Sequence, residues 1–99
     1  MYTRTGALTA AAGKGRALAD ILLRAADVVD ELDGSIQYLV GQGVDSPDTI
    51  VVLEVWESMA AHEASLGDPD VQALIGEARP LIIGMETGVE ARLLGGLGL

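Results

Sequence analysis

The sequence predicts an α+β domain of the ferredoxin-like type, a split βαβ arrangement with a four-stranded antiparallel sheet covered by helices on one face. Two observations predict this class. First, the elements inferred below follow the order strand, helix, strand, strand, helix pair, strand. Second, the segment TIVVLEVWES at residues 49–58 is apolar on both of its alternating faces. Helices can cover one of these faces, and we expect a second sheet to cover the other.

The first three elements follow from local patterns. Residues 2–10 alternate threonine with larger side chains, which predicts a strand that ends before Gly13. Residues 16–32 carry apolar side chains at spacings of three and four, which predicts an amphipathic helix. Gly34 ends this helix, because glycine adopts the left-handed cap conformation cheaply. Apolar residues alternate again in residues 35–40, which predicts the second strand.

The second half contains a loop, a strand, two short helices and a last strand. Residues 41–48 are rich in glycine, aspartate and proline, so they predict a hairpin loop before the apolar strand at residue 49. The serine that ends that strand can cap a helix over residues 59–66. A second short helix begins at Pro69, with an aspartate cap before it, and is interrupted at Pro80. Alternation over residues 85–94 predicts the fourth strand.

Length, charge and composition limit the classes of function. We expect residues 1–99 to form one domain, whose 49% of apolar residues exceed what a small monomer easily buries, so a homodimer is predicted. A net charge of −9 disfavours nucleic acid and anionic membrane surfaces as partners. The absence of cysteine, of a signal-peptide pattern and of a long apolar run favours a cytoplasmic protein.

Five short motifs carry a resemblance to a known family. They are the Gly13-Lys14 turn, the Asp33-Gly34-Ser35 turn, the Glu54-Val55-Trp56-Glu57-Ser58 signature, the Leu66-Gly67-Asp68-Pro69 break and Ala78-Arg79-Pro80-Leu81. Together they resemble the antibiotic biosynthesis monooxygenase-like domains of the dimeric α+β barrel superfamily. The resemblance covers almost the whole chain. It implies a homodimer whose sheets form a barrel, with a pocket between sheet and helices in each subunit.

The same resemblance implies a reaction. Several members of that family oxidise polyphenols or quinols with molecular oxygen and without metal or flavin, so the leading hypothesis is a cofactor-independent monooxygenase acting on a small polyphenol, quinol or anthrone-like ligand, with no cofactor and no metal. Such chemistry needs a base that titrates near neutral pH, donors for an oxyanion and a dry apolar pocket. Two alternatives remain: a non-catalytic small-molecule-binding or stress-associated barrel, and an isomerase, lyase or cyclase on the same fold.

The candidate catalytic residues are His62 and Trp56. His62 is the only histidine and titrates in the useful range, so it is the predicted base, although a packed or solvent-facing histidine fits its surroundings too. Trp56 is the only tryptophan, and its indole N–H is a predicted donor to a substrate oxygen. Its alternative role is core packing at the end of a strand.

The candidate substrate-binding residues are Tyr38, Glu54 and Arg79. Tyr38 offers a phenolic donor, as does Tyr2, although aromatic residues on a sheet face more often form core. Glu54 shares the face of Trp56 and is either a second base or, as buried carboxylates usually are, paired with an arginine. Arg79 is a candidate clamp for a phenolate, or simply a cation at a helix end.

Two departures from the family pattern bear on the reaction. The chain has no asparagine, so the asparagine that some polyphenol-oxidising members use is absent, and Val52 occupies the inward position before Glu54. The heme-degrading members resemble this chain less, because Ser65 and a histidine-free segment over residues 70–79 stand where their tryptophan and histidine ligand are expected. Heme degradation is therefore not predicted.

Overall fold

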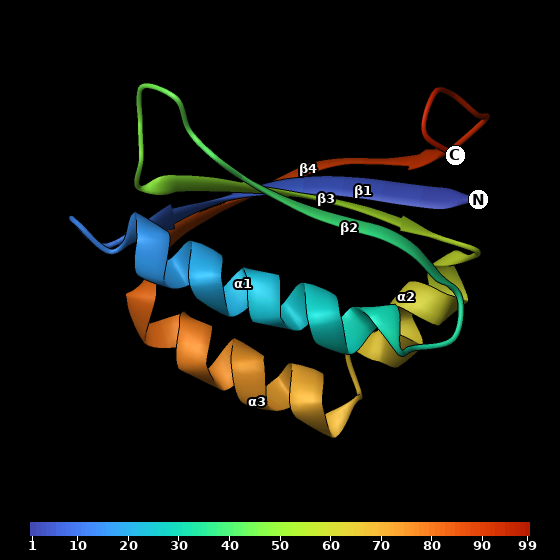
Figure 1. The fold of residues 1–99 in the computed structure, drawn as a ribbon, viewed down its shortest axis with the longest axis horizontal. Helices are drawn as coiled ribbons and strands as arrows, with labels where there is room; N and C mark the ends of the chain where they lie inside the picture. The colour runs from blue at the N-terminus through green and yellow to red at the C-terminus, as the bar shows by residue number, and fades with distance from the viewer.

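One antiparallel sheet with helices on a single face makes up the structure, a computed structural model that describes residues 1–99 (Figure 1). The elements are β1 (Tyr2–Ala10), α1 (Gly15–Asp30), β2 (Ser35–Gln42), β3 (Thr49–Trp56), α2 (Met59–Ser65), α3 (Pro69–Ala78), η1 (Arg79–Leu81) and β4 (Ile82–Arg92). The four strands lie in the order β2-β3-β1-β4. The predicted ferredoxin-like α+β class and element order are confirmed.

Several boundaries differ by one to three residues from those predicted, and two of these differences have a clear local reason. The helix α1 ends at Asp30, two residues early, because the N–H of Leu32 bonds to the carbonyl of Val29 and tightens the chain into a turn. The strand β4 begins at Ile82, directly after the turn that contains Pro80. An irregularity in its pairing with β1 at this point breaks the alternation of side chains, so the sequence pattern starts only at residue 85.

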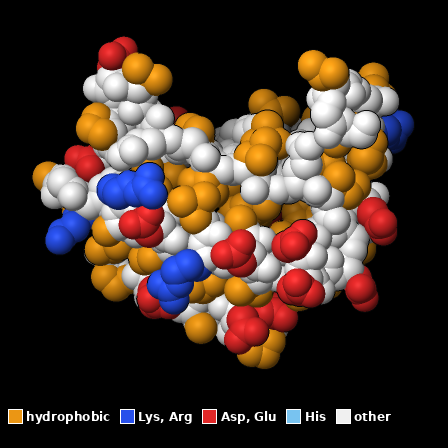
Figure 2. Space-filling model, viewed as in Figure 1, with side chains coloured by type: hydrophobic (Ala, Val, Ile, Leu, Met, Phe, Trp, Pro, Cys, Tyr) orange, Lys and Arg blue, Asp and Glu red, His pale blue; other side chains and the backbone are white.

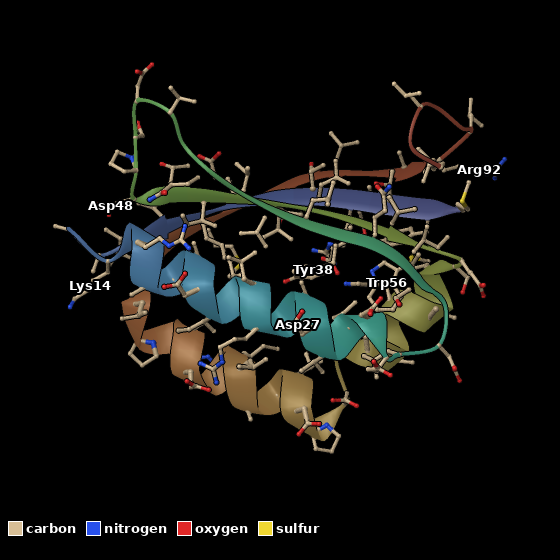
Figure 3. All side chains as sticks on the ribbon, viewed as in Figure 1. Lys14, Asp27, Tyr38, Asp48, Trp56 and Arg92 are labelled. Atoms are coloured by element: carbon tan, nitrogen blue, oxygen red, sulfur yellow. The ribbon has the colours of Figure 1, made fainter.

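The hairpin loop before β3 caps the first helix. The carboxylate of Asp48 accepts hydrogen bonds from the backbone N–H groups of Gly13 (3.0 Å) and Gly15 (2.9 Å). Lys14, the residue at the cap position, makes no capping bond with its own side chain, so an aspartate from a distant loop satisfies these donors (Figure 3). This contact fixes the start of α1 against β3.

The core lies between the sheet and the helices. Its largest fully buried side chains are Leu18 of α1 together with Ile50 and Trp56 of β3. The amphipathic α1 turns its buried residues, including Ala25 and Val29, toward the sheet, and α3 packs alongside α1 (Figure 1). The Ile50 face of β3 is therefore the one that helices cover, as the alternation predicted.

The opposite face of the sheet has no helix over it. We call this surface the open face and define it by the exposed side chains of Leu39, Val51 and Leu53, whose relative exposures are 54%, 47% and 37%. Leu39 and Leu53 are cross-strand partners, so they form one apolar patch. Figure 2 shows hydrophobic side chains gathered in the hollow between the hairpin loop and the C-terminal tail.

One corner of the open face is covered by the chain itself. Val55 lies on the same side of β3 as Leu53, yet it is only 3% exposed. Its cross-strand partner Gln37 donates a hydrogen bond to the carbonyl of Gly98, which holds the C-terminal tail over this end of the sheet (Figure 1). A second subunit was predicted over the Val51/Leu53/Val55 face; within one chain Val55 is already buried, whereas Val51 and Leu53 are exposed. No helix in the structure has both the length and the apolar character needed to cross a membrane.

Candidate functional site

A cavity of about 380 Å³ lies between the sheet and the helices α1 and α3. Thirteen of its 17 lining residues are hydrophobic. They are Leu8, Ile21, Leu22, Ala25, Val29, Tyr38, Leu66, Val71, Leu74, Ile75, Ala78, Ile82 and Met85. The four others are Glu54, His62, Ser65 and Arg79. Its volume and its few polar groups match what small aromatic ligands require.

His62 is held rigidly at one end of this cavity. The hydroxyl of Ser58 accepts a hydrogen bond from the N–H of Ala61 and so starts the helix α2, which carries His62 one residue later. The imidazole lies between two aromatic rings, with centroid distances of 5.7 Å to Tyr2 and 5.8 Å to Trp56. The residue is only 4% exposed, so it is neither solvent-facing nor free to change position easily.

Glu54 is the carboxylate of this end of the cavity. Its Oε1 accepts a hydrogen bond of 3.1 Å from the indole N–H of Trp56 and lies 3.9 Å from His62 Nε2. Its Oε2 lies 3.8 Å from Nε of Arg4, which pairs with it as an ion but is too distant for a good hydrogen bond. An arginine does compensate this buried carboxylate, and it comes from the neighbouring strand β1.

Arg4 also determines the tautomer of His62. Its Nη1 lies 3.2 Å from His62 Nε2. A guanidinium has donors only, so Nε2 must be the acceptor and the neutral imidazole carries its proton on Nδ1. We refer to Arg4, Glu54 and His62 together as the polar cluster of the cavity.

Burial lowers the pKa of His62 below its ordinary value of 6.5. The charges that act on it come from every neighbouring element: Glu54 on β3, Glu63 on α2 itself, Glu90 on β4 and Arg4 on β1. The three carboxylates raise the pKa, Glu54 most strongly, whereas Arg4 lowers it. The net shift is downward, so His62 is an uncharged proton acceptor at neutral pH.

Tyr38, on β2, supplies a donor beside Glu54, its cross-strand partner. Burial raises the pKa of its hydroxyl far above the ordinary value of 10.0, and the nearby charge of Glu54 adds to the effect. The hydroxyl therefore stays protonated, and it lines the cavity without a hydrogen bond to another side chain. Figure 3 shows Tyr38 and Trp56 both directed into the space between sheet and helices. The Tyr38 hydroxyl is therefore free to donate to a group in the cavity.

The remaining predicted residues occupy different positions. Trp56 is fully buried and does not line the cavity, and its N–H is already used by Glu54. The indole therefore orients Glu54, and a substrate oxygen cannot take the same proton. Arg79 lines the cavity at the end of α3, whereas His62 and Ser65 line it beside the start of that helix. The structure thus brings His62, Glu54 and Tyr38 together and places Arg79 apart from them.

Sequence reasoning missed Arg4 as a functional residue. Its signal was present, because alternation in β1 places Arg4 on the same face as Tyr2 and Leu8. The pairing of β1 with β3, which sets Arg4 directly opposite Glu54, is what brings it beside the two cavity residues Glu54 and His62. For metal binding, no three histidine, aspartate or glutamate side chains lie close enough together to hold an ion.

Comparison with known proteins gives a consistent assignment. The model of the antibiotic biosynthesis monooxygenase family matches residues 1–77. A crystal structure from Chloroflexus aurantiacus J-10-fl, described as a proposed antibiotic biosynthesis monooxygenase, is 37% identical, with 98% of this chain and 96% of that chain covered and a TM-score of 0.89. No curated protein matches the chain.

Two more distant structures share the fold. One, described as a proposed antibiotic biosynthesis monooxygenase from Deinococcus radiodurans, is 22% identical, with 100% of this chain and 98% of that chain covered and a TM-score of 0.83. The other is an asparagine-to-alanine variant of SnoaB, a cofactor-independent oxygenase from Streptomyces nogalater, at 18% identity, 99% and 97% coverage and a TM-score of 0.82.

Proposed function

This chain belongs to the antibiotic biosynthesis monooxygenase family, and we propose that it is a cofactor-independent monooxygenase that oxidises a small polyphenol, quinol or anthrone-like molecule with O₂. Residues 1–99 then form one catalytic domain. SnoaB, which has the same fold, is a cofactor-independent oxygenase and so offers a precedent for this chemistry.

The observation that carries the proposal is the cavity with acid–base groups at one end only. Its walls are apolar, which suits a planar aromatic ligand and keeps water away from the reacting carbon. An uncharged His62 accepts the phenolic proton, and the protonated Tyr38 donates to the oxygen that becomes an anion. A filled space around His62 would instead have favoured the non-catalytic barrel.

The chemistry needs nothing beyond substrate and O₂. His62 removes the proton from the O–H group, and the resulting anion transfers one electron to O₂, which gives an organic radical and superoxide. These two combine to form a C–O bond and a peroxide. Loss of water from this peroxide at a CH₂ carbon leaves a carbonyl, so one O atom enters the product and the other becomes water. The polar cluster returns to its starting state when His62 gives up its proton.

Oxygen consumption tests the proposal. Metal-free protein would be mixed with a panel of hydroquinones and anthrones, and O₂ uptake and quinone formation would be followed together. We expect uptake by the wild type with one quinone per O₂, and a decrease of about 10²-fold or more in His62→Gln, the typical contribution of general base catalysis. Glu31→Gln is the control, because Glu31 is exposed and is not among the charges that act on His62. No uptake by the wild type across the panel would refute the proposal.

We further propose that the protein is a homodimer in which two open faces meet. Leu39, Val51 and Leu53 expose a continuous apolar surface that a monomer would leave in water. A two-fold axis places the same patch of each subunit against the other, so one self-complementary surface is enough. The cavity lies on the other side of the sheet, so dimer formation leaves it accessible.

A further inference from the structure

Arg4 is the cationic side chain closest to the acid–base groups, and some of its N–H donors have no partner within the protein. Of the five N–H donors of its guanidinium, one reaches His62 Nε2, and the guanidinium also lies within hydrogen-bond reach of the Tyr2 hydroxyl. Its contact with Glu54 is a single 3.8 Å approach through Nε and lacks the paired geometry of a tight arginine–carboxylate bridge. The carboxylate of Glu90, on the neighbouring strand, accepts from Tyr2 instead. The remaining donors of Arg4 are therefore available to a ligand.

Arg4 also faces space that a ligand can occupy. It lines a hollow of about 170 Å³ that adjoins the main cavity. The two share five lining residues, Leu8, Leu22, Tyr38, Glu54 and Met85. Arg4 keeps 30% of its side chain exposed there, whereas Glu54 keeps 16%. A ligand beside His62 and Tyr38 thus lies next to the hollow that the guanidinium lines.

We propose that Arg4 is the anion-binding residue of the cavity and receives the oxyanion that forms when His62 takes the phenolic proton of the substrate. In the free protein the guanidinium donates to His62 Nε2 and so occupies the lone pair of the base. An incoming O–H group replaces it as the donor to Nε2. The guanidinium then turns to the substrate oxygen, and this frees the base and supplies the counter-charge in one movement.

The proton and charge balance of this step is complete. The O–H bond breaks, its proton goes to His62 Nε2, and the electron pair stays on the oxygen beside Arg4 and Tyr38. His62 becomes an imidazolium that lies 3.9 Å from Glu54 Oε1, so a carboxylate stabilises it. Arg4 meanwhile leaves this new cation, which removes a like-charge repulsion. The inference rests on the proposed function for the identity of the substrate, but anion binding itself requires no turnover.

Arg79, the arginine that the sequence suggested as the clamp, serves this role less well. It lies at the end of α3, where Ala78 and Ile82 are its neighbours in the cavity wall. The groups that move the proton line the cavity beside the start of that helix. An oxyanion created at His62 therefore forms next to Arg4, whose guanidinium lies 3.2 Å from His62 Nε2.

Binding of two matched probes tests the inference without turnover. 4-Nitro-1-naphthol is ionised at mildly alkaline pH, whereas its methyl ether has the same rings and no charge, and titration calorimetry would give both dissociation constants. We expect Arg4→Met to weaken binding of the naphtholate by about tenfold or more and to change ether binding by less than about twofold. Arg4→Lys keeps the charge without the forked geometry and should lie between the two. Arg92→Met, on the exposed edge strand, is the matched control.

NMR of the wild type supplies a readout that no variant can confound. The nitrogen shifts of His62 should show the Nδ1–H tautomer in the free protein, and naphtholate should alter the Nε2 signal as Arg4 leaves it. Equal weakening of both probes in Arg4→Met, loss of the naphtholate preference in Arg79→Met alone, an Nε2–H tautomer, or no binding of naphtholate to the wild type would each overturn the inference. Selective loss in Arg4→Met with no O₂ uptake on any substrate would support anion binding and refute only the oxygenase.

Discussion

Replacing Trp56 by phenylalanine tests whether the indole holds the carboxylate of the polar cluster. The ring of Trp56 is fully buried, and its N–H donates to Glu54 Oε1 at 3.1 Å. Phenylalanine keeps an aromatic ring in the core but has no donor. Glu54 would then keep only the long contact to Arg4 and the approach to His62. The variant therefore isolates a hydrogen bond that positions the site without touching a ligand.

The expected loss of stability has two parts. A hydrogen bond to a charged, mostly buried carboxylate contributes about 1.5–3 kcal/mol, because the unpaired group loses its solvation without compensation. The smaller ring leaves an empty space, which adds about 1 kcal/mol. Trp56→Phe should therefore lower the free energy of unfolding by about 3 kcal/mol, a large share of the stability of a 99-residue domain.

Urea denaturation followed by circular dichroism measures this loss, since the variant removes the only tryptophan and with it the fluorescence signal. A double-mutant cycle with Glu54→Gln separates the two parts, because glutamine keeps an acceptor without the charge. We expect a coupling of about 1 kcal/mol, the difference between charged and neutral hydrogen bonds. Tyr2→Phe, which removes an exposed bond to Glu90, should cost less than about 1 kcal/mol. The same loss for Trp56→Phe in both backgrounds would refute the reasoning.

Three further predictions concern titration and assembly. The free energy of unfolding of the wild type should fall as the pH drops below 6.5, by at most about 1.4 kcal/mol per pH unit. The reason is that the histidine of the unfolded chain is protonated at a higher pH than buried His62. Urea titrations at neutral and mildly acidic pH would measure this loss, and His62→Gln should not show it. Above pH 10.0 the unfolded chain ionises its tyrosines first, so the wild type should lose stability there and Tyr38→Phe should lose less; an equal loss would contradict the raised pKa. Leu53→Asp should turn the dimer into a monomer in sedimentation, whereas Val44→Asp, at a position 98% exposed in the hairpin loop, should remain a dimer.

Most of the fold could be predicted from local sequence patterns, because each element carries its own signal. Helix α1 has an apolar stripe that only a helical period explains, and Pro69 behind an aspartate marks the start of α3. The errors arose where tertiary pairing overrides a pattern. Strand β4 begins before the alternation of its side chains does, because Ile82 pairs with Ala10 of β1 beyond a shift in the register of the two strands. Val55 is buried although it points to the open face, and no local pattern predicts the hydrogen bond that holds the C-terminal tail near it, from its cross-strand partner Gln37 to Gly98.

The site was less predictable because its chemistry depends on juxtaposition. His62, Glu54 and Tyr38 could be chosen as rare or inward-facing polar residues, and the structure lines the cavity with all three. Which donor bonds to which acceptor could not be predicted in the same way. Whether the indole of Trp56 serves the substrate or Glu54 depends on a distance, and the importance of Arg4 depends on its register against β3. The polar side chains of the site could thus be predicted from the sequence, whereas their hydrogen-bond and ion-pair partners depend on how the strands pair.

Strand β3 connects the two proposals through the alternation of its side chains. Glu54 and Trp56 point toward the helices and hold the polar cluster, while Val51 and Leu53 point to the open face. A substitution on one face should therefore leave the other face's property unchanged unless it shifts the strand itself. A monomeric Leu53→Asp protein that still prefers the naphtholate would show that the cavity is complete within one subunit. Loss of that preference together with the dimer would show that the second sheet is needed to hold β3 in the register that sets Arg4 opposite Glu54.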